Sequence, residues 1–142
     1  MKKIFLLLAI PFFLMKGYAQ QKKLKDLIGH WEIVGDKDNV VSLEVIDSST
    51  IILSYNGEKK KLTDYKIDFD KSPIWFDFST VADSNSVVAV KSIIEIMNDN
   101  MIKWQLFVDE ERTPYFSSSK GELFYLRKTK AAVTTIPSVV SN

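Results

Sequence analysis

Apolar and polar residues alternate with a period of two over most of the chain between residues 30 and 128. This alternation is typical of β-strands that bury one face, and the segments are rich in β-branched and aromatic residues. Polar turns of two to six residues separate most of them. The eight predicted strands span His30–Asp36, Asn39–Asp47, Thr50–Tyr55, Lys60–Asp70, Pro73–Thr80, Val87–Met97, Met101–Val108 and Gly121–Lys128.

The short turns predict an antiparallel sheet in which strands that follow each other pair. Asn56-Gly57 is the strongest turn signal, because both residues tolerate a positive φ. Eight such strands avoid exposed edges by closing into an up-and-down barrel, so we expect an all-β, eight-stranded antiparallel barrel. A half-open barrel or a sandwich is the alternative. The spacing of leucines over Gln21–Leu27 predicts a short helix that acts as a lid or plug.

The N-terminus has the layout of a secretory signal peptide. Lys2 and Lys3 precede an apolar run over Ile4–Met15, and small residues at Gly17 and Ala19 fit a cleavage site after Ala19. A membrane anchor is the alternative, but the run is shorter than the ~20 residues that a span needs. We therefore expect a signal peptide over residues 1–19, a barrel over 20–128 and a flexible tail over 129–142, in a protein exported to the periplasm or secreted.

Charge and composition narrow the classes of partner. Removing Lys2, Lys3 and Lys16 with the signal peptide leaves 16 basic against 18 acidic residues, a net charge of −2. This balance gives no reason to expect nucleic acid as a partner, and no later segment resembles a membrane span. The absence of cysteine and the single histidine argue against a zinc site. No phosphate loop or catalytic triad stands out either, so we expect neither a metal nor a cofactor, and no enzyme activity.

Two ends of the barrel pattern carry a more specific signal. The first strand opens with "LIGHW", in which Gly29 precedes Trp31, and the last strand reads "LFYLRKT", which contains Arg127. This arrangement resembles the G-x-W start of the lipocalin barrels. The resemblance implies that Trp31 fills the closed end of the barrel and that Arg127 stacks over its ring.

The second half resembles a lipocalin-like family of uncharacterised exported bacterial proteins. The matching segments are "YKIDFDKSPIWFDFS", "SIIEIMNDNMIKWQLF" and "ERTPYF", and the resemblance covers roughly residues 24–128. It implies a lipocalin-like fold and export, and it implies no activity. The chain departs from the family pattern at Ser92, where glycine is common, and in "RTPYF", which lacks an acidic residue before the phenylalanine.

The loop around "RTPYF" raises a separate question, because it holds Arg112 among aromatic residues. Asp77 and Glu95 lie among apolar strand residues and would need a partner if they were buried. One interpretation is structural: Arg112 pairs with one of these carboxylates, and Tyr115 helps to pin the loop across a barrel mouth. In the other, the loop is a lid and Arg112 binds the anionic group of a ligand.

Two functions follow from the sequence. The protein binds a small apolar or amphipathic molecule in the barrel mouth. Alternatively, it is an envelope or secreted structural or protein-interaction domain whose core is filled by side chains and takes no ligand. Aromatic residues make up 12% of the chain and suit either a lined or a filled barrel. The sequence predicts neither the identity of a ligand nor the oligomeric state.

Overall fold

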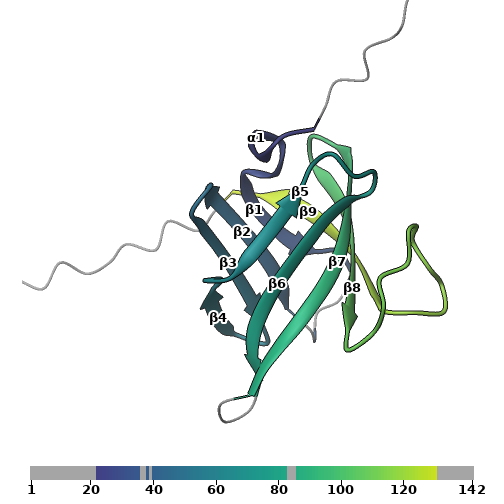
Figure 1. The fold of residues 1–142 in the computed structure, drawn as a ribbon. Coiled ribbons are helices and arrows are strands. Elements are labelled where there is room, and N and C mark those ends of the chain that lie inside the picture. Colours follow the sequence, from purple (N-terminus) through teal and green to yellow (C-terminus); the bar gives the residue numbers. More distant parts are fainter. Residues whose placement is uncertain (1–21, 36–37, 39, 83–85, 131–142) are drawn as a thin grey trace, which may run out of the picture.

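Nine strands and one short helix form the part of the chain that the computed structural model describes, which is residues 22–35, 38, 40–82 and 86–130 (Figure 1). The predicted signal peptide and residues 131–142 of the predicted tail lie outside the described residues. All paired strands are antiparallel, in the order β4-β3-β2-β1-β9-β8-β7-β6-β5. The elements are α1 (Leu24–Leu27), β1 (Gly29–Ile33), β2 (Val41–Asp47), β3 (Thr50–Tyr55), β4 (Glu58–Lys61), β5 (Tyr65–Asp68), β6 (Ile74–Ala82), β7 (Ser86–Asn98), β8 (Met101–Val108) and β9 (Glu122–Thr129).

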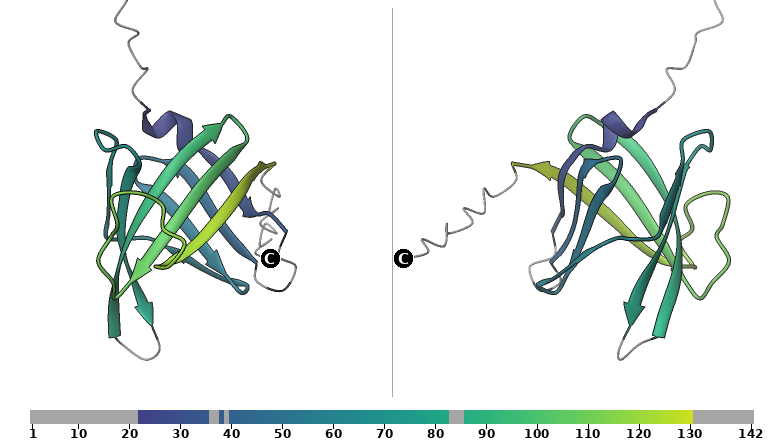
Figure 2. Two further views of the ribbon diagram at one scale, coloured as in Figure 1. Left: turned by 90° about the vertical axis from the view of Figure 1, so that its right-hand side faces the viewer. Right: turned by 60° about the vertical axis from the view of Figure 1, so that its left-hand side comes forward.

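The sheet curls into a half-barrel and does not close (Figures 1 and 2). The all-β antiparallel prediction is confirmed, whereas the closed eight-stranded barrel is wrong. The reason lies in the segment predicted as one strand, Lys60–Asp70, which breaks at residues 62–64. Its first two residues belong to β4, which begins at Glu58 and pairs with β3, and its second part contains β5, which pairs with β6. Consecutive strands therefore form the two opposite edges of the sheet.

Single hydrogen bonds, rather than a ladder, connect the two sides of the opening. The Nζ of Lys60 on β4 donates to the carbonyl oxygen of Val81 on β6 at 2.9 Å. The hydroxyl of Tyr65 on β5 likewise donates across the opening, to the carbonyl oxygen of Ser48 in the turn between β2 and β3. The linking residue Leu62 is buried, and its N–H donates to Ile51 at 2.8 Å. These contacts hold the curl, although no ladder joins β4 to β6 among the described residues.

The concave face of the sheet holds the main core. Because side chains alternate across the pleat, each strand contributes every second residue to this face. Fully buried members are Trp31, Leu43, Ile51, Phe76, Ile94, Ile102, Trp104 and Leu126. α1 covers one end of the half-barrel, where Leu27 is buried and its carbonyl oxygen accepts a 2.8 Å hydrogen bond from Trp31 Nε1 (Figure 1). The helix predicted over Gln21–Leu27 is thus observed as a single turn at its C-terminal end.

The turn prediction at Asn56-Gly57 is confirmed. Asn56 has a φ of 50° and Gly57 a φ of 85°, and they join β3 to β4. Positive φ at both central residues gives a tight hairpin the right-handed twist of its strands.

Among the described residues, none forms a helix long and apolar enough to cross a membrane.

A smaller core lies on the convex face. Ile93, Gln105 and Phe107 point away from the concave core, yet all three are fully buried. The segment over residues 109–121, between β8 and β9, lies outside the half-barrel and covers them (Figures 1 and 2). We call this segment the outer loop.

Candidate functional site

Trp31 is fully buried at the end of the half-barrel under α1, and the cation over its ring is not the predicted Arg127. Lys128 places its Nζ 5.1 Å from the centre of the Trp31 ring. Arg127 is exposed and pairs in register with Glu32, whereas Lys128 pairs with Trp31. The assignment of Arg127 was wrong by one residue, and a shift of one residue moves a strand side chain to the opposite face. A Cβ on Gly29 would lie 2.4 Å from Lys128 Cε, so glycine leaves room for this side chain.

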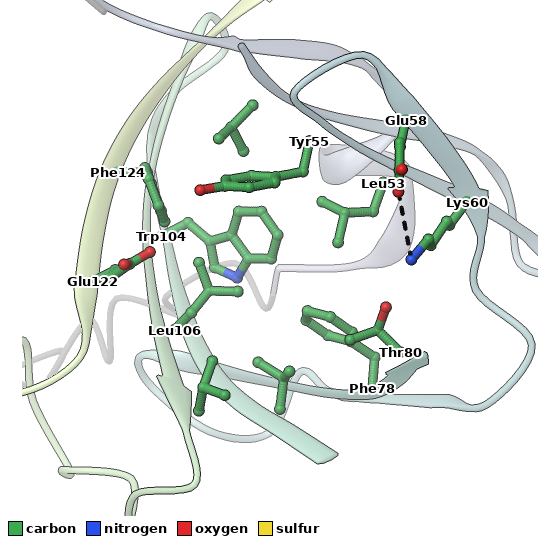
Figure 3. A pocket seen from close by; sticks show the side chains of 13 residues that line it. Leu53, Tyr55, Glu58, Lys60, Phe78, Thr80, Trp104, Leu106, Glu122 and Phe124 are labelled. Carbon is green, nitrogen blue, oxygen red and sulfur yellow. Dashed lines mark ion pairs between the residues drawn. The ribbon is translucent and has the colours of Figure 1, made fainter. Parts of the chain in front are cut away.

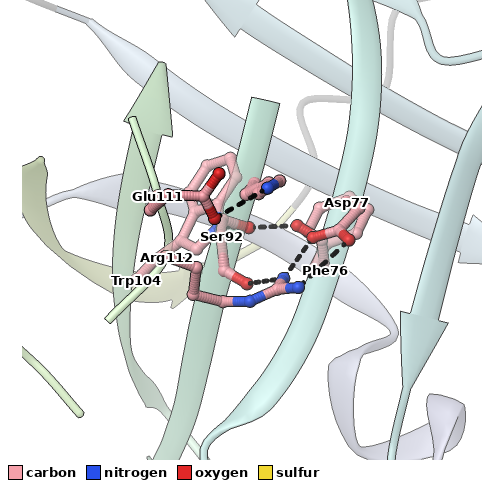
Figure 4. Close-up of polar contacts among 7 residues, drawn as sticks. Phe76, Asp77, Ser92, Trp104, Glu111 and Arg112 are labelled. Atoms are coloured by element: carbon pink, nitrogen blue, oxygen red, sulfur yellow. Dashed lines mark hydrogen bonds and ion pairs between the residues drawn. The ribbon is translucent and has the colours of Figure 1, made fainter. Parts of the chain in front are cut away.

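Arg112 lies on the convex face and pairs with Asp77 (Figure 4). Its Nη1 donates to Asp77 Oδ1 in a close contact, and its Nη2 donates to Oδ2 at 3.3 Å. The guanidinium carbon lies 3.7 Å above the centre of the Trp75 ring. The Arg112 side chain is only 11% exposed, but that of Asp77 is 41% exposed. The pair therefore fastens the outer loop at a site that water still reaches.

The other two members of the predicted cluster do not join this pair. Glu95 is exposed and lies opposite Lys103 in the β7–β8 register. Tyr115 is 72% exposed, and its carbonyl oxygen accepts from Thr113 Oγ1 at 2.6 Å. The aromatic residue that anchors the loop is Phe116, which lies under the Nζ of Lys103 at 4.3 Å.

Gln105 on β8 anchors the outer loop, and the sequence pattern did not predict this role. Its Nε2 donates to the carbonyl oxygens of Ser117 and Lys120, both at 2.7 Å. Its Oε1 accepts from the N–H of Ser117 at 2.9 Å. A polar residue that alternates with apolar ones indicates an exposed face, and nothing in the pattern shows that a loop covers it. The outer loop thus packs outside the sheet and does not cross the barrel mouth.

A cavity of about 320 Å³ lies inside the half-barrel, at the end opposite α1 (Figure 3). Its walls come from the concave positions of β2, β3, β4, β6, β7, β8 and β9. The apolar residues with the largest side chains among those that line it are Leu53, Tyr55, Phe78, Trp104, Leu106 and Phe124. No residue of the outer loop lines this cavity.

The floor of the cavity is held by Trp104. Its ring packs beside Phe78 and Phe124, with ring centres 6.2 and 6.5 Å away. Its Nε1 donates to Ser92 Oγ at 2.9 Å, and this hydroxyl donates to the carbonyl oxygen of Phe76 (Figure 4). The hydroxyl of Ser92 therefore satisfies the buried indole. The carbonyl oxygen of Ser92 also accepts from Arg112 Nη1 at 3.4 Å, which connects the floor to the outer loop.

Three charged side chains lie at the mouth of the cavity. Figure 3 shows Glu122 on one side and the Glu58–Lys60 pair on the other. Lys60 Nζ lies 3.7 Å from Glu58 Oε2. Sequence reasoning missed Glu122, although its spacing from Phe124 and Leu126 is the pattern that places it on the concave face. The arrangement suits a molecule with an apolar body and one polar end.

Within the described part of the chain, no group of three or more His, Asp or Glu residues is placed to hold a metal ion. His30 lies near α1 and contacts Glu32 Oε1 at 3.0 Å, at the opposite end from the cavity. Comparison with protein-family models, with curated proteins and with solved structures found no significant match to this chain. The lipocalin resemblance therefore stays a hypothesis from sequence motifs.

Proposed function

We propose that this protein is an exported, lipocalin-like binding protein that holds a small apolar or amphipathic molecule at the open end of its half-barrel. The observation that carries the proposal is the cavity of about 320 Å³, with apolar walls and polar groups at its mouth. Ligand sites in proteins have this composition and begin at about 300 Å³, so the molecule is small. No catalytic step is part of the proposal.

The geometry also supports a division of the barrel into two parts. Trp31, Leu27 and Lys128 fill the end under α1, so that end supplies stability. The other end leaves its aromatic walls open, and burial of a ligand against them would remove apolar surface from water at about 25 cal/mol per Å². The envelope-domain alternative, with a core filled throughout, requires that nothing enters this space.

Fluorescence of the neutral apolar probe N-phenyl-1-naphthylamine tests the proposal. We expect the probe to bind with increased emission and to transfer energy from Trp104. The variant Leu106→Trp, which fills the cavity, should abolish binding. The matched control is Leu123→Trp, because Leu123 is 40% exposed and lies one position out of phase with Phe124, on the convex face.

Melting temperatures of both variants show whether the fold is intact. Binding that Leu106→Trp leaves unchanged, in a folded protein, would place the probe elsewhere and contradict the proposal. Absence of binding to the parent protein would favour the envelope-domain alternative.

A further inference from the structure

Three charged side chains line the cavity, and their charges do not sum to zero. Glu122 occupies a concave position on β9, in phase with Phe124. Glu58 and Lys60 occupy concave positions on β4, opposite Tyr55 and Leu53. Two carboxylates and one ammonium give the mouth a net charge of −1.

The single cation is already engaged. Lys60 Nζ donates to the carbonyl oxygen of Val81 at 2.9 Å and lies 3.7 Å from Glu58. The carboxylate of Glu122 has no hydrogen bond or ion pair to any other residue in the described ranges. The charge left available to a bound molecule is therefore negative.

The aromatic walls favour the same kind of ligand. Tyr55, Phe78, Trp104 and Phe124 surround the space between the two charged sides (Figure 3). The face of an aromatic ring carries partial negative charge and attracts cations within about 6 Å of its centre. An anionic ligand would gain no such attraction, and Arg112, to which the lid interpretation assigns an anionic group, lies on the convex side.

We infer that the cavity selects apolar molecules with one positively charged headgroup, such as an alkylammonium ion. The apolar part lies against Trp104, and the headgroup lies at the mouth beside Glu122. This inference rests on the proposed function and specifies the ligand class for that same cavity.

Displacement of N-phenyl-1-naphthylamine by n-octylamine, n-octanol and n-octanoate at neutral pH tests it, because the three share a chain and differ in charge. We expect the ammonium ion to displace the probe at about one-tenth of the concentration needed for the carboxylate, with the alcohol between them, as expected for one nearby unit charge partly exposed to water. Equal or stronger displacement by octanoate would overturn the inference and leave the proposed function standing. Failure of the probe itself to bind would overturn both.

The variant Glu122→Gln tests whether Glu122 is the residue that recognises the positive charge of the headgroup. It should weaken octylamine binding about fivefold and leave octanol unchanged. The matched control is Glu95→Gln, which makes the same change in net charge at an exposed position outside the cavity and should leave both affinities unchanged. An octylamine-to-octanol ratio that is equal in the parent and in Glu122→Gln would contradict the assignment of Glu122.

Discussion

Trp31 and Trp104 are both fully buried, and their indole N–H groups are satisfied by different partners. Trp31 donates to a backbone carbonyl of α1, whereas Trp104 donates to the hydroxyl of Ser92. At the residue scale, the buried N–H of Trp104 at the cavity floor therefore depends on the Ser92 side chain, which a substitution can remove without changing the backbone.

Ser92→Ala should lower the free energy of unfolding by about 1–3 kcal/mol, because it leaves the Trp104 N–H buried without an acceptor. Chemical denaturation followed by tryptophan fluorescence measures the change. Ser118→Ala is the control, since Ser118 is exposed. An equal stability of the two variants would mean that the indole finds another partner.

Arg112→Ala should lower the free energy of unfolding by about 1–2 kcal/mol, from lost stacking on Trp75 and a partly exposed ion pair. The loss stays below that of a buried pair because Asp77 is 41% exposed and remains hydrated when its partner is gone. The control Arg127→Ala, at an exposed position, should change stability by no more than about 0.5 kcal/mol. A larger loss at Arg127 than at Arg112 would refute the placement of both residues.

The carboxyl group of Asp47 should titrate with a pKa below its ordinary value. The N–H and the hydroxyl of Ser49 donate to it at 2.8 and 2.9 Å, and these bonds stabilise the charged form. Its contribution to stability is present above the unfolded-state pKa and is lost as the pH falls through the lower folded-state pKa. Carboxyl NMR titration checks this, and Ser49→Ala should move the pKa back upwards.

At the scale of elements, the alternation of apolar and polar residues predicted where most strands lie. It did not predict which strands pair across the break at residues 62–64, or which residues a distant loop covers. Residues 62–64 interrupt a segment in which apolar and polar residues alternate both before and after the break. The curl of the whole sheet determines the strand with which each half pairs. Arg127 and Lys128 are adjacent cations, and the two-residue period from Phe124 and Leu126 places Lys128 on the concave face, where the β1–β9 register sets it opposite Trp31. The alternation around Gln105 predicts an exposed side chain, because burial by the outer loop leaves no trace in the neighbouring sequence.

Gln105→Leu tests the anchoring of the outer loop. It keeps the side-chain size but removes three hydrogen bonds, so the loop should detach more often while the half-barrel stays folded. Trypsin should then cleave after Arg112 or Lys120 faster than in the parent protein, as mass spectrometry of early fragments would show. Unchanged cleavage within the loop would mean that Arg112 and Phe116 hold it without Gln105.

At the scale of the whole molecule, the half-barrel is filled under α1 and hollow at the other end. The concave positions of most strands were predictable from the two-residue period, and Leu53, Trp104 and Phe124 are among them. Which of these line a cavity was not predictable, because it depends on where the curled sheet is covered and where it is open. We propose that the open end takes up a ligand.

The most direct test is to locate a bound probe by NMR with methyl-labelled protein and N-phenyl-1-naphthylamine. The account predicts intermolecular nuclear Overhauser effects from the probe to methyl groups of Leu53, Leu106 and Val108, which line the cavity. It predicts none to Leu27, under α1, or to Ile93, under the outer loop. Contacts confined to Leu27 or Ile93, or a probe that contacts no methyl group of the cavity, would contradict the account.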